Sequence, residues 1–123
     1  MTLADITTKL PPVVAAYIAA TNASDGAALS ATFAEDALVN DARREYWGKA
    51  AIMRWADREI IGDRVTMEIV GVVEHYGDMI VTAKMDGNYD KTGLPDPLLL
   101  TFYFTLHGDA ISKLIIVHNK PAD

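Results

Sequence analysis

The sequence contains no cysteine, and this absence removes several classes of chemistry at once. Without thiols the chain can form no disulfide, bind no metal through thiolates and use no cysteine nucleophile. It also lacks any block of Lys or Arg, since 11 basic residues stand against 17 acidic ones for a net charge of -6. We therefore expect no binding to nucleic acid or to an anionic membrane surface.

Long apolar runs, targeting signals and metal motifs are missing as well. No stretch approaches the roughly 20 apolar residues of a membrane span, and MTLADITTKLPP at the N-terminus lacks the basic start and apolar run of a signal peptide. The spacing of His75, His107 and His118 matches no metal motif. No phosphate loop, dinucleotide fingerprint or Ser-His-Asp signature is present. We expect a cytoplasmic protein that needs no metal and no cofactor.

The composition that is present is typical of one globular domain. Of the 123 residues, half are apolar and 23% are charged. A chain of this length can enclose a hydrophobic core. Because no internal repeat divides it, we expect a single domain over residues 1–123.

Hydrophobic periodicity predicts helices first and strands afterwards. Apolar residues at helical spacing predict three helices, and alternating apolar residues predict strands. The predicted helices cover residues 11–25, 26–33 and 49–61, and the predicted strands cover 37–41, part of 42–48, 65–76, 79–90, 98–107 and 110–119. This order is typical of an α+β fold in which the three N-terminal helices pack against a curved sheet of mainly antiparallel strands.

Gly71 interrupts the alternation of its strand and predicts a β-bulge that bends the sheet. A bent sheet wrapped around helices forms a cone, and the interior of a cone is a natural site for a small molecule. The function therefore depends on which polar side chains point into that interior.

Asp41 is the first candidate, because it follows Ala37 and Val39 at strand spacing in the segment ALVND. One interpretation is a strand-end aspartate that caps the NDAR turn. The other places Asp41 on the inward face with Ala37 and Val39. Apolar surroundings would then raise the pKa of its carboxyl and suit it to act as a general base that removes a proton next to a carbonyl.

Tyr17 is the second candidate, because it lies on the apolar face of the first predicted helix with Val14, Ile18 and Thr21. It is either a core residue or a phenol that donates a hydrogen bond to a developing oxyanion. Large apolar side chains would form the wall of the pocket and suit a polycyclic or terpenoid skeleton better than a sugar or a phosphate. These predicted wall residues are Trp47, Trp55, Leu100, Phe102 and Phe104.

The segments VVAAYIAATNASD, FAEDALVND, YWGKAAIMRW and LLLTFYFTLHGDAISKL, in this order, resemble the SnoaL-like branch of the nuclear transport factor 2-like superfamily. The resemblance implies a cystatin-like cone with a deep pocket, usually assembled as a homodimer through the outer face of the sheet. The first half looks most like Δ5-3-ketosteroid isomerase, in which an aspartate base works beside an oxyanion hole made of a tyrosine and a protonated aspartic acid. On this resemblance Tyr17 matches the tyrosine and Asp41 matches the base.

The second half departs from the isomerase pattern at two positions. The protonated aspartic acid is replaced by Leu100 or Thr101, and alternation with Phe102 and Phe104 favours Leu100. Ala56 stands where the isomerase has a supporting tyrosine. Losing one oxyanion donor costs about 100- to 1000-fold in rate.

Three functions follow from these observations. The first is an isomerase-like or cyclase-like enzyme in which Asp41 moves a proton on an apolar carbonyl compound that Tyr17 polarises. The second is a protein that binds an apolar ligand in the same pocket without turnover. The third is a dimeric interaction protein whose cone is filled by its own side chains.

Overall fold

The computed structural model describes residues 10–118, and its helices and strands follow one another in the predicted order. The elements are α2 (Pro12–Asn22), α3 (Gly26–Ala31), β1 (Phe33–Asp41), β2 (Arg44–Trp47), α4 (Lys49–Ala56), the π-helical turn η1 (Asp57–Ile61), β3 (Thr66–His75), β4 (Asp78–Asp86), β5 (Leu98–His107) and β6 (Ala110–His118). The first nine and last five residues of the predicted domain, with the end of the strand predicted over 110–119, lie outside the described part.

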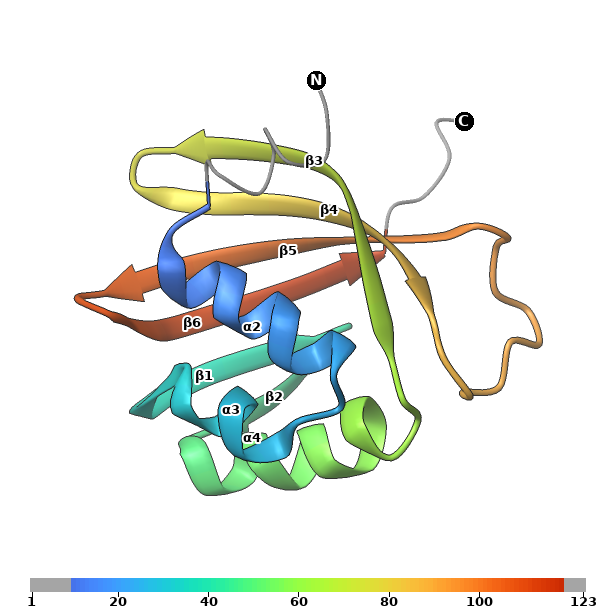
Figure 1. Ribbon diagram of the computed structural model, residues 1–123, viewed down its shortest axis with the longest axis horizontal. Helices are drawn as coiled ribbons and strands as arrows, with labels where there is room; N and C mark the ends of the chain where they lie inside the picture. The colour runs from blue at the N-terminus through green and yellow to red at the C-terminus, as the bar shows by residue number, and fades with distance from the viewer. Residues whose placement is uncertain (1–9, 119–123) are drawn as a thin grey trace.

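One six-stranded mixed sheet forms the body of the fold, with the strand order β2-β1-β6-β5-β4-β3. The pair β1 and β6 is parallel, and the other neighbouring strands are antiparallel. Figure 1 shows α2 lying across one face of this sheet, with α3 and α4 below it, so that the helices cover the inner face. The expected α+β architecture is confirmed.

The sheet bends where the sequence predicted a bulge. The register between β3 and β4 shifts by one residue between Ile69 and Gly71, and β3 curves strongly along its length in Figure 1. An extra residue in one strand of an antiparallel pair bends that strand and increases its twist. The curved β3 passes the C-terminal end of α2, where the Asn22 side chain bonds the backbone of Met67.

The core lies between α2 and the inner face of the central strands. Pro12 occupies the first turn of α2, where a missing N–H costs nothing, and the helix buries Val14, Tyr17, Ala20 and Thr21 as a single face. This agrees with the predicted face except that Ile18 is only half-buried. The ring of Tyr17 contacts three phenylalanines, Phe33, Phe102 and Phe104.

The second and third helices end differently from the prediction. The helix predicted over 26–33 ends at Ala31, because Phe33 already belongs to β1. The helix predicted over 49–61 changes at Asp57 from α-helical to π-helical hydrogen bonding, as the Gly62 N–H bond to the Asp57 carbonyl shows. Within residues 10–118 no helix is long and apolar enough to cross a membrane.

Candidate functional site

A cavity of about 280 Å³ lies between α2, the segment α4–η1 and the inner face of the sheet. Its volume falls just below the range of roughly 300–1,000 Å³ that is usual for small-molecule sites. Its apolar lining is formed by Tyr17, Ala42, Trp55, Ile60, Val65, Met67, Met85, Leu94, Leu98, Leu100, Phe102 and Ile116. Its polar lining is formed by Thr21, Asp41, Arg44, Glu59, Asp63, Tyr89, Asp90 and His118.

Asp41 ends β1 and turns its carboxylate toward the cavity, where 18% of the side chain is exposed. Its Oδ2 atom accepts a hydrogen bond of 3.0 Å from the indole Nε1 of Trp55 and one of 2.8 Å from Arg44. The turn that follows is capped by the neighbouring residue, because the Asn40 Oδ1 accepts the backbone N–H of Arg43 at 2.9 Å. Asp41 is therefore a cavity-lining carboxylate, and Asn40 stabilises the turn.

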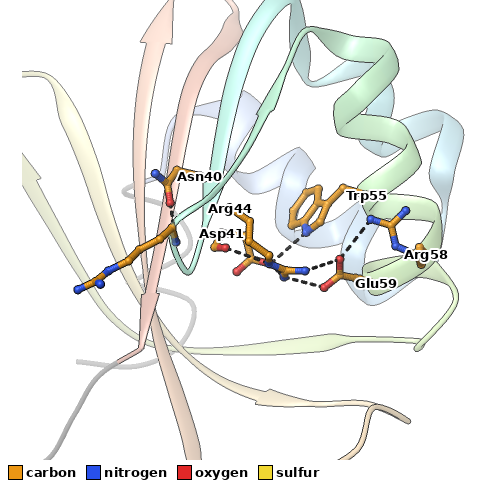
Figure 2. A network of polar contacts seen from close by, with 7 residues as sticks. Asn40, Asp41, Arg44, Trp55, Arg58 and Glu59 are labelled. Atoms are coloured by element: carbon orange, nitrogen blue, oxygen red, sulfur yellow. Dashed lines mark hydrogen bonds and ion pairs between the residues drawn. The ribbon is translucent and has the colours of Figure 1, made fainter.

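Arg44 connects the carboxylate of Asp41 to a second acid. Two guanidinium nitrogens bond the two oxygens of Glu59 at 2.9 and 2.7 Å, and one of them also pairs with Asp41. Figure 2 shows this network spanning the β1–β2 hairpin and the η1 turn, with Trp55 beside it. The hydrogen bond to Glu59 is the main cause that raises the pKa of Arg44 above its usual value. The Arg44 guanidinium therefore always carries a positive charge at the rim of the cavity.

Tyr17 lies at the inner end of the same cavity and is 1% exposed. Burial raises the pKa of its phenol well above the usual value, and the negative charge of Asp41 raises it further, while the nearby Thr21 side chain opposes the shift. The phenol is therefore protonated at neutral pH and can act only as the O–H form. Because the charge of Asp41 influences the pKa of Tyr17, the two groups must lie near each other, as expected when both line the same cavity.

Of the five predicted wall residues, three line the cavity, one is buried elsewhere in the core and one is exposed. Trp55, Leu100 and Phe102 line the cavity, which agrees with the inward orientation that alternation favoured for Leu100 over Thr101. Phe104 is fully buried but packs on Tyr17 at 5.2 Å between ring centroids, away from the cavity lining.

The prediction that Trp47 forms part of the pocket wall is wrong. Trp47 lies on the short edge strand β2 and is 66% exposed. Its neighbour Tyr46 faces the helix instead and stacks on Trp55 with ring centroids 5.8 Å apart. Because successive side chains of a strand point to opposite faces, the inward position of Tyr46 turns Trp47 outward.

Sequence reasoning identified Asp41 but missed its polar partners Arg44 and Glu59, and it missed Thr21. Arg44 stands three residues after Asp41, and Glu59 comes 15 residues after Arg44, so no helical or strand periodicity links the three. Thr21 was placed on the inner face of α2 but was not considered as a site residue. Its position one helical turn after Tyr17 was the signal that could have found it.

A larger and more polar hollow of about 650 Å³ adjoins the site beneath the β4–β5 connection. It carries charged side chains of both signs, including Glu68, Lys84 and Asp86, and it does not reach Tyr17 or Asp41. Among residues 10–118, no three His, Asp or Glu side chains are grouped so that they could hold a metal ion. The smaller cavity is therefore the site where the candidate chemical groups meet.

Comparison with known proteins agrees with this architecture. Residues 14–114 match the SnoaL-like domain, and the chain belongs to the SnoaL-like family. A structure from Sinorhizobium meliloti, given as a candidate polyketide cyclase, is 31% identical with a TM-score of 0.80, and the alignment covers 90% of this chain and 98% of that one.

Two more distant structures show the same fold. A Catenulispora acidiphila protein with a ketosteroid isomerase-like fold, in complex with trimethylamine, is 22% identical with a TM-score of 0.73, covering 89% of this chain and 86% of that one. An uncharacterised cystatin-fold protein from Novosphingobium aromaticivorans is 18% identical with a TM-score of 0.68, covering 85% and 94%. No curated protein matches the chain significantly. The predicted membership of the SnoaL-like family is confirmed, and these distant structures share its fold.

Proposed function

We propose that the protein binds a compact apolar carbonyl compound in the 280 Å³ cavity and transfers a proton on it, with Asp41 as the base and Tyr17 as the hydrogen-bond donor. The observation that carries this proposal is that a carboxylate and a protonated, buried phenol line one mainly apolar cavity. A base and a donor separated by an apolar space are the two groups that removal of a proton next to a carbonyl requires.

The proton transfer would use the free oxygen of the Asp41 carboxylate. Both Trp55 and Arg44 donate to Oδ2, and in the described part of the chain no hydrogen bond reaches Oδ1. Oδ1 would take the proton from the carbon next to the carbonyl, and the electron pair would move to the carbonyl oxygen, where Tyr17 donates its hydrogen bond. Return of the proton to a conjugated carbon is an isomerisation. Attack of the enolate carbon on a second carbonyl of the same molecule forms a C–C bond and an alkoxide, which takes back the proton from Asp41, and this is a cyclisation.

The lining also restricts the substrate. Asp41, Glu59, Asp63 and Asp90 outnumber the basic side chains at the rim, so a phosphorylated or carboxylate-rich ligand would meet like charge. The volume suits a compound of one or two fused rings better than a long polycyclic skeleton. The similar structure from Sinorhizobium meliloti, given as a candidate polyketide cyclase, supports a carbonyl compound of the polyketide type.

Exchange of the α-protons of β-tetralone in heavy water, followed by proton NMR, tests the proposal before the natural substrate is found. We expect the protein to accelerate exchange and Asp41→Asn to reduce the acceleration by about 100-fold or more. Asparagine keeps the acceptor for Trp55 and Arg44 but cannot take the proton. Asp36→Asn, an exposed aspartate on the same strand, is the matched control and should keep the wild-type rate.

The second candidate is a binding protein that uses the same cavity without turnover. The ion pair between Arg44 and Asp41 favours it, because a carboxylate already paired with a guanidinium at 2.8 Å can hold and orient a ligand without accepting a proton. If β-tetralone binds and its α-protons exchange no faster than in buffer, the enzyme proposal is wrong and the binding function remains. The open cavity counts against a cone filled by its own side chains.

A further inference from the structure

We infer that Thr21 is the second hydrogen-bond donor of this site, and that its hydroxyl and the Tyr17 phenol together bind the carbonyl oxygen of the ligand. The inference rests on the proposed function, which assigned a donor role to Tyr17 alone. It concerns the donor role that the carboxylic acid has in the isomerase pattern and that Leu100, at the matching position of this chain, cannot fill.

The position of Thr21 is the first observation. It follows Tyr17 by four residues on α2, so both side chains lie on the same face of the helix. Thr21 is 1% exposed and lines the cavity with Tyr17. The two hydroxyl groups thus enter the cavity from one element, at its buried end.

The unpaired state of the Thr21 hydroxyl is the second observation. Among residues 10–118, three polar side chains are buried, namely Thr21, Thr32 and Thr101. The Thr32 hydroxyl donates to the Leu29 carbonyl at 2.7 Å, and Thr101 is also engaged. The Oγ1 of Thr21 has no partner with full hydrogen-bond geometry in the described part of the chain, although it lies close enough to the Tyr17 phenol to lower the pKa of that group.

An unpaired buried hydroxyl is unfavourable and rare, so its presence needs a reason. Threonine within a helix usually bonds the carbonyl four residues earlier, which here belongs to Tyr17, and that bond is not formed. Valine would fill the same volume without an unpaired polar group. A ligand oxygen entering the cavity would supply the missing partner.

The carbonyl oxygen of a ligand can accept two hydrogen bonds, one at each lone pair. Trp55 and Arg44 cannot supply the second one, because their donors are directed at Asp41 and Glu59. Leu100 and Phe102 on the opposite wall have no donor at all. Tyr89 and His118 also line the cavity, but Tyr89 is only half-buried and His118 is exposed. Among residues 10–118, Thr21 is therefore the remaining donor at the buried end, and the pair Tyr17 and Thr21 would select carbonyl compounds over hydrocarbons of the same shape.

Two ligands of matched shape, β-tetralone and the hydrocarbon tetralin, test this inference by calorimetric titration. Thr21→Val removes the hydroxyl at constant volume, and Thr21→Ser keeps it. We expect Thr21→Val to weaken β-tetralone binding by about 3- to 10-fold, with tetralin binding unchanged, and Thr21→Ser to stay within about two-fold of wild type. The carbonyl stretching band of bound β-tetralone should move to higher frequency in Thr21→Val, because one hydrogen bond is lost.

Stability without ligand provides an independent readout. Thr21→Val should unfold at the same or a higher urea concentration than wild type, since it removes an unpaired polar group. A clear loss of stability would show that the hydroxyl is bonded within the protein and would overturn the inference. Equal weakening of β-tetralone and tetralin would also overturn it, because that result indicates packing alone.

The remaining outcomes separate this inference from the proposed function. If Tyr17→Phe removes the preference for β-tetralone and Thr21→Val leaves it intact, Tyr17 acts alone and the Thr21 inference is wrong while the proposed function stands. If the wild-type protein shows no preference for β-tetralone over tetralin, the carbonyl-binding function itself is wrong.

Discussion

At the scale of single residues, the two tryptophans differ sharply although both were expected in the pocket wall. Trp55 is fully buried and donates to Asp41 at 3.0 Å. Trp55→Phe keeps an aromatic ring but removes this hydrogen bond to a charged acceptor, which contributes roughly 1.5–3 kcal/mol. We expect the free energy of unfolding at neutral pH, measured by urea denaturation, to fall by about that amount.

Trp47→Phe is the control for this prediction, because its ring is two-thirds exposed on an edge strand. A substitution there should change stability by no more than about 0.5 kcal/mol. If Trp55→Phe were equally mild, the indole N–H would contribute nothing to holding Asp41. If Trp47→Phe were the more damaging of the two, Trp47 would have a buried environment that the isolated chain does not show.

At the scale of elements, the π-helical turn η1 explains why the charged network could not be read from the sequence. The change from α-helical to π-helical bonding at Asp57 alters the angular position of the residues after it, including Glu59. A Cβ at Gly62 would come within 2.8 Å of the Arg58 carbonyl, so glycine allows the turn to close. This geometry places Glu59 within hydrogen-bond distance of Arg44, and neither helical nor strand periodicity predicts that contact.

Other parts of the fold and site were predictable because they depend on local periodicity. The bulge at Gly71 and the inward placement of Tyr17 each follow from one interrupted or regular pattern. The orientation of the side chains of β2 could not be predicted. This strand has only four residues and lies at the edge of the sheet, so its sequence does not show which of its alternating side chains face the helix. Tyr46, and not Trp47, therefore contacts Trp55.

Asn22 connects two elements through its side chain and gives the element-scale prediction. At the end of α2 its amide donates to the Met67 carbonyl at 3.1 Å and accepts the Met67 N–H at 2.7 Å. These two bonds hold β3 against α2 where Met67 lines the cavity. Asn22→Ala would leave a largely buried backbone N–H unpaired, and we expect a loss of about 1–3 kcal/mol in urea denaturation.

The matched control is Asn88→Ala, because Asn88 is exposed and, within residues 10–118, only its backbone N–H is bonded, to the Asp63 carbonyl. That variant should stay within about 0.5 kcal/mol of wild type. Hydrogen exchange adds a local measurement, since the Met67 amide should lose protection in Asn22→Ala. An unchanged exchange rate at Met67 would show that the side-chain connection does not control the position of β3.

At the scale of the whole molecule, the outer face of the sheet has an apolar row that the helices do not cover. The register aligns Val73 with Ile80, Ile80 with Tyr103 and Tyr103 with Ile115, so their side chains share the outer face across four strands. Val73 and Tyr103 are exposed in the isolated chain. A contiguous apolar patch of this kind is typical of a protein–protein contact, and we propose that it is the homodimer interface expected from the resemblance.

Tyr103→Glu tests that interface by sedimentation velocity. A stable dimer buries about 800 Å² on each partner, and a carboxylate at the centre of the row would be buried against the same carboxylate of the second copy, at a cost of several kcal/mol. We expect wild type to sediment as a dimer at micromolar concentration and Tyr103→Glu as a folded monomer. Ala27→Glu, at an exposed position on α3, should remain dimeric. A wild-type monomer, or a dimer that survives Tyr103→Glu, would show that this face is free. The cavity opens on the other side of the sheet from this row, so β-tetralone binding should persist in the monomer.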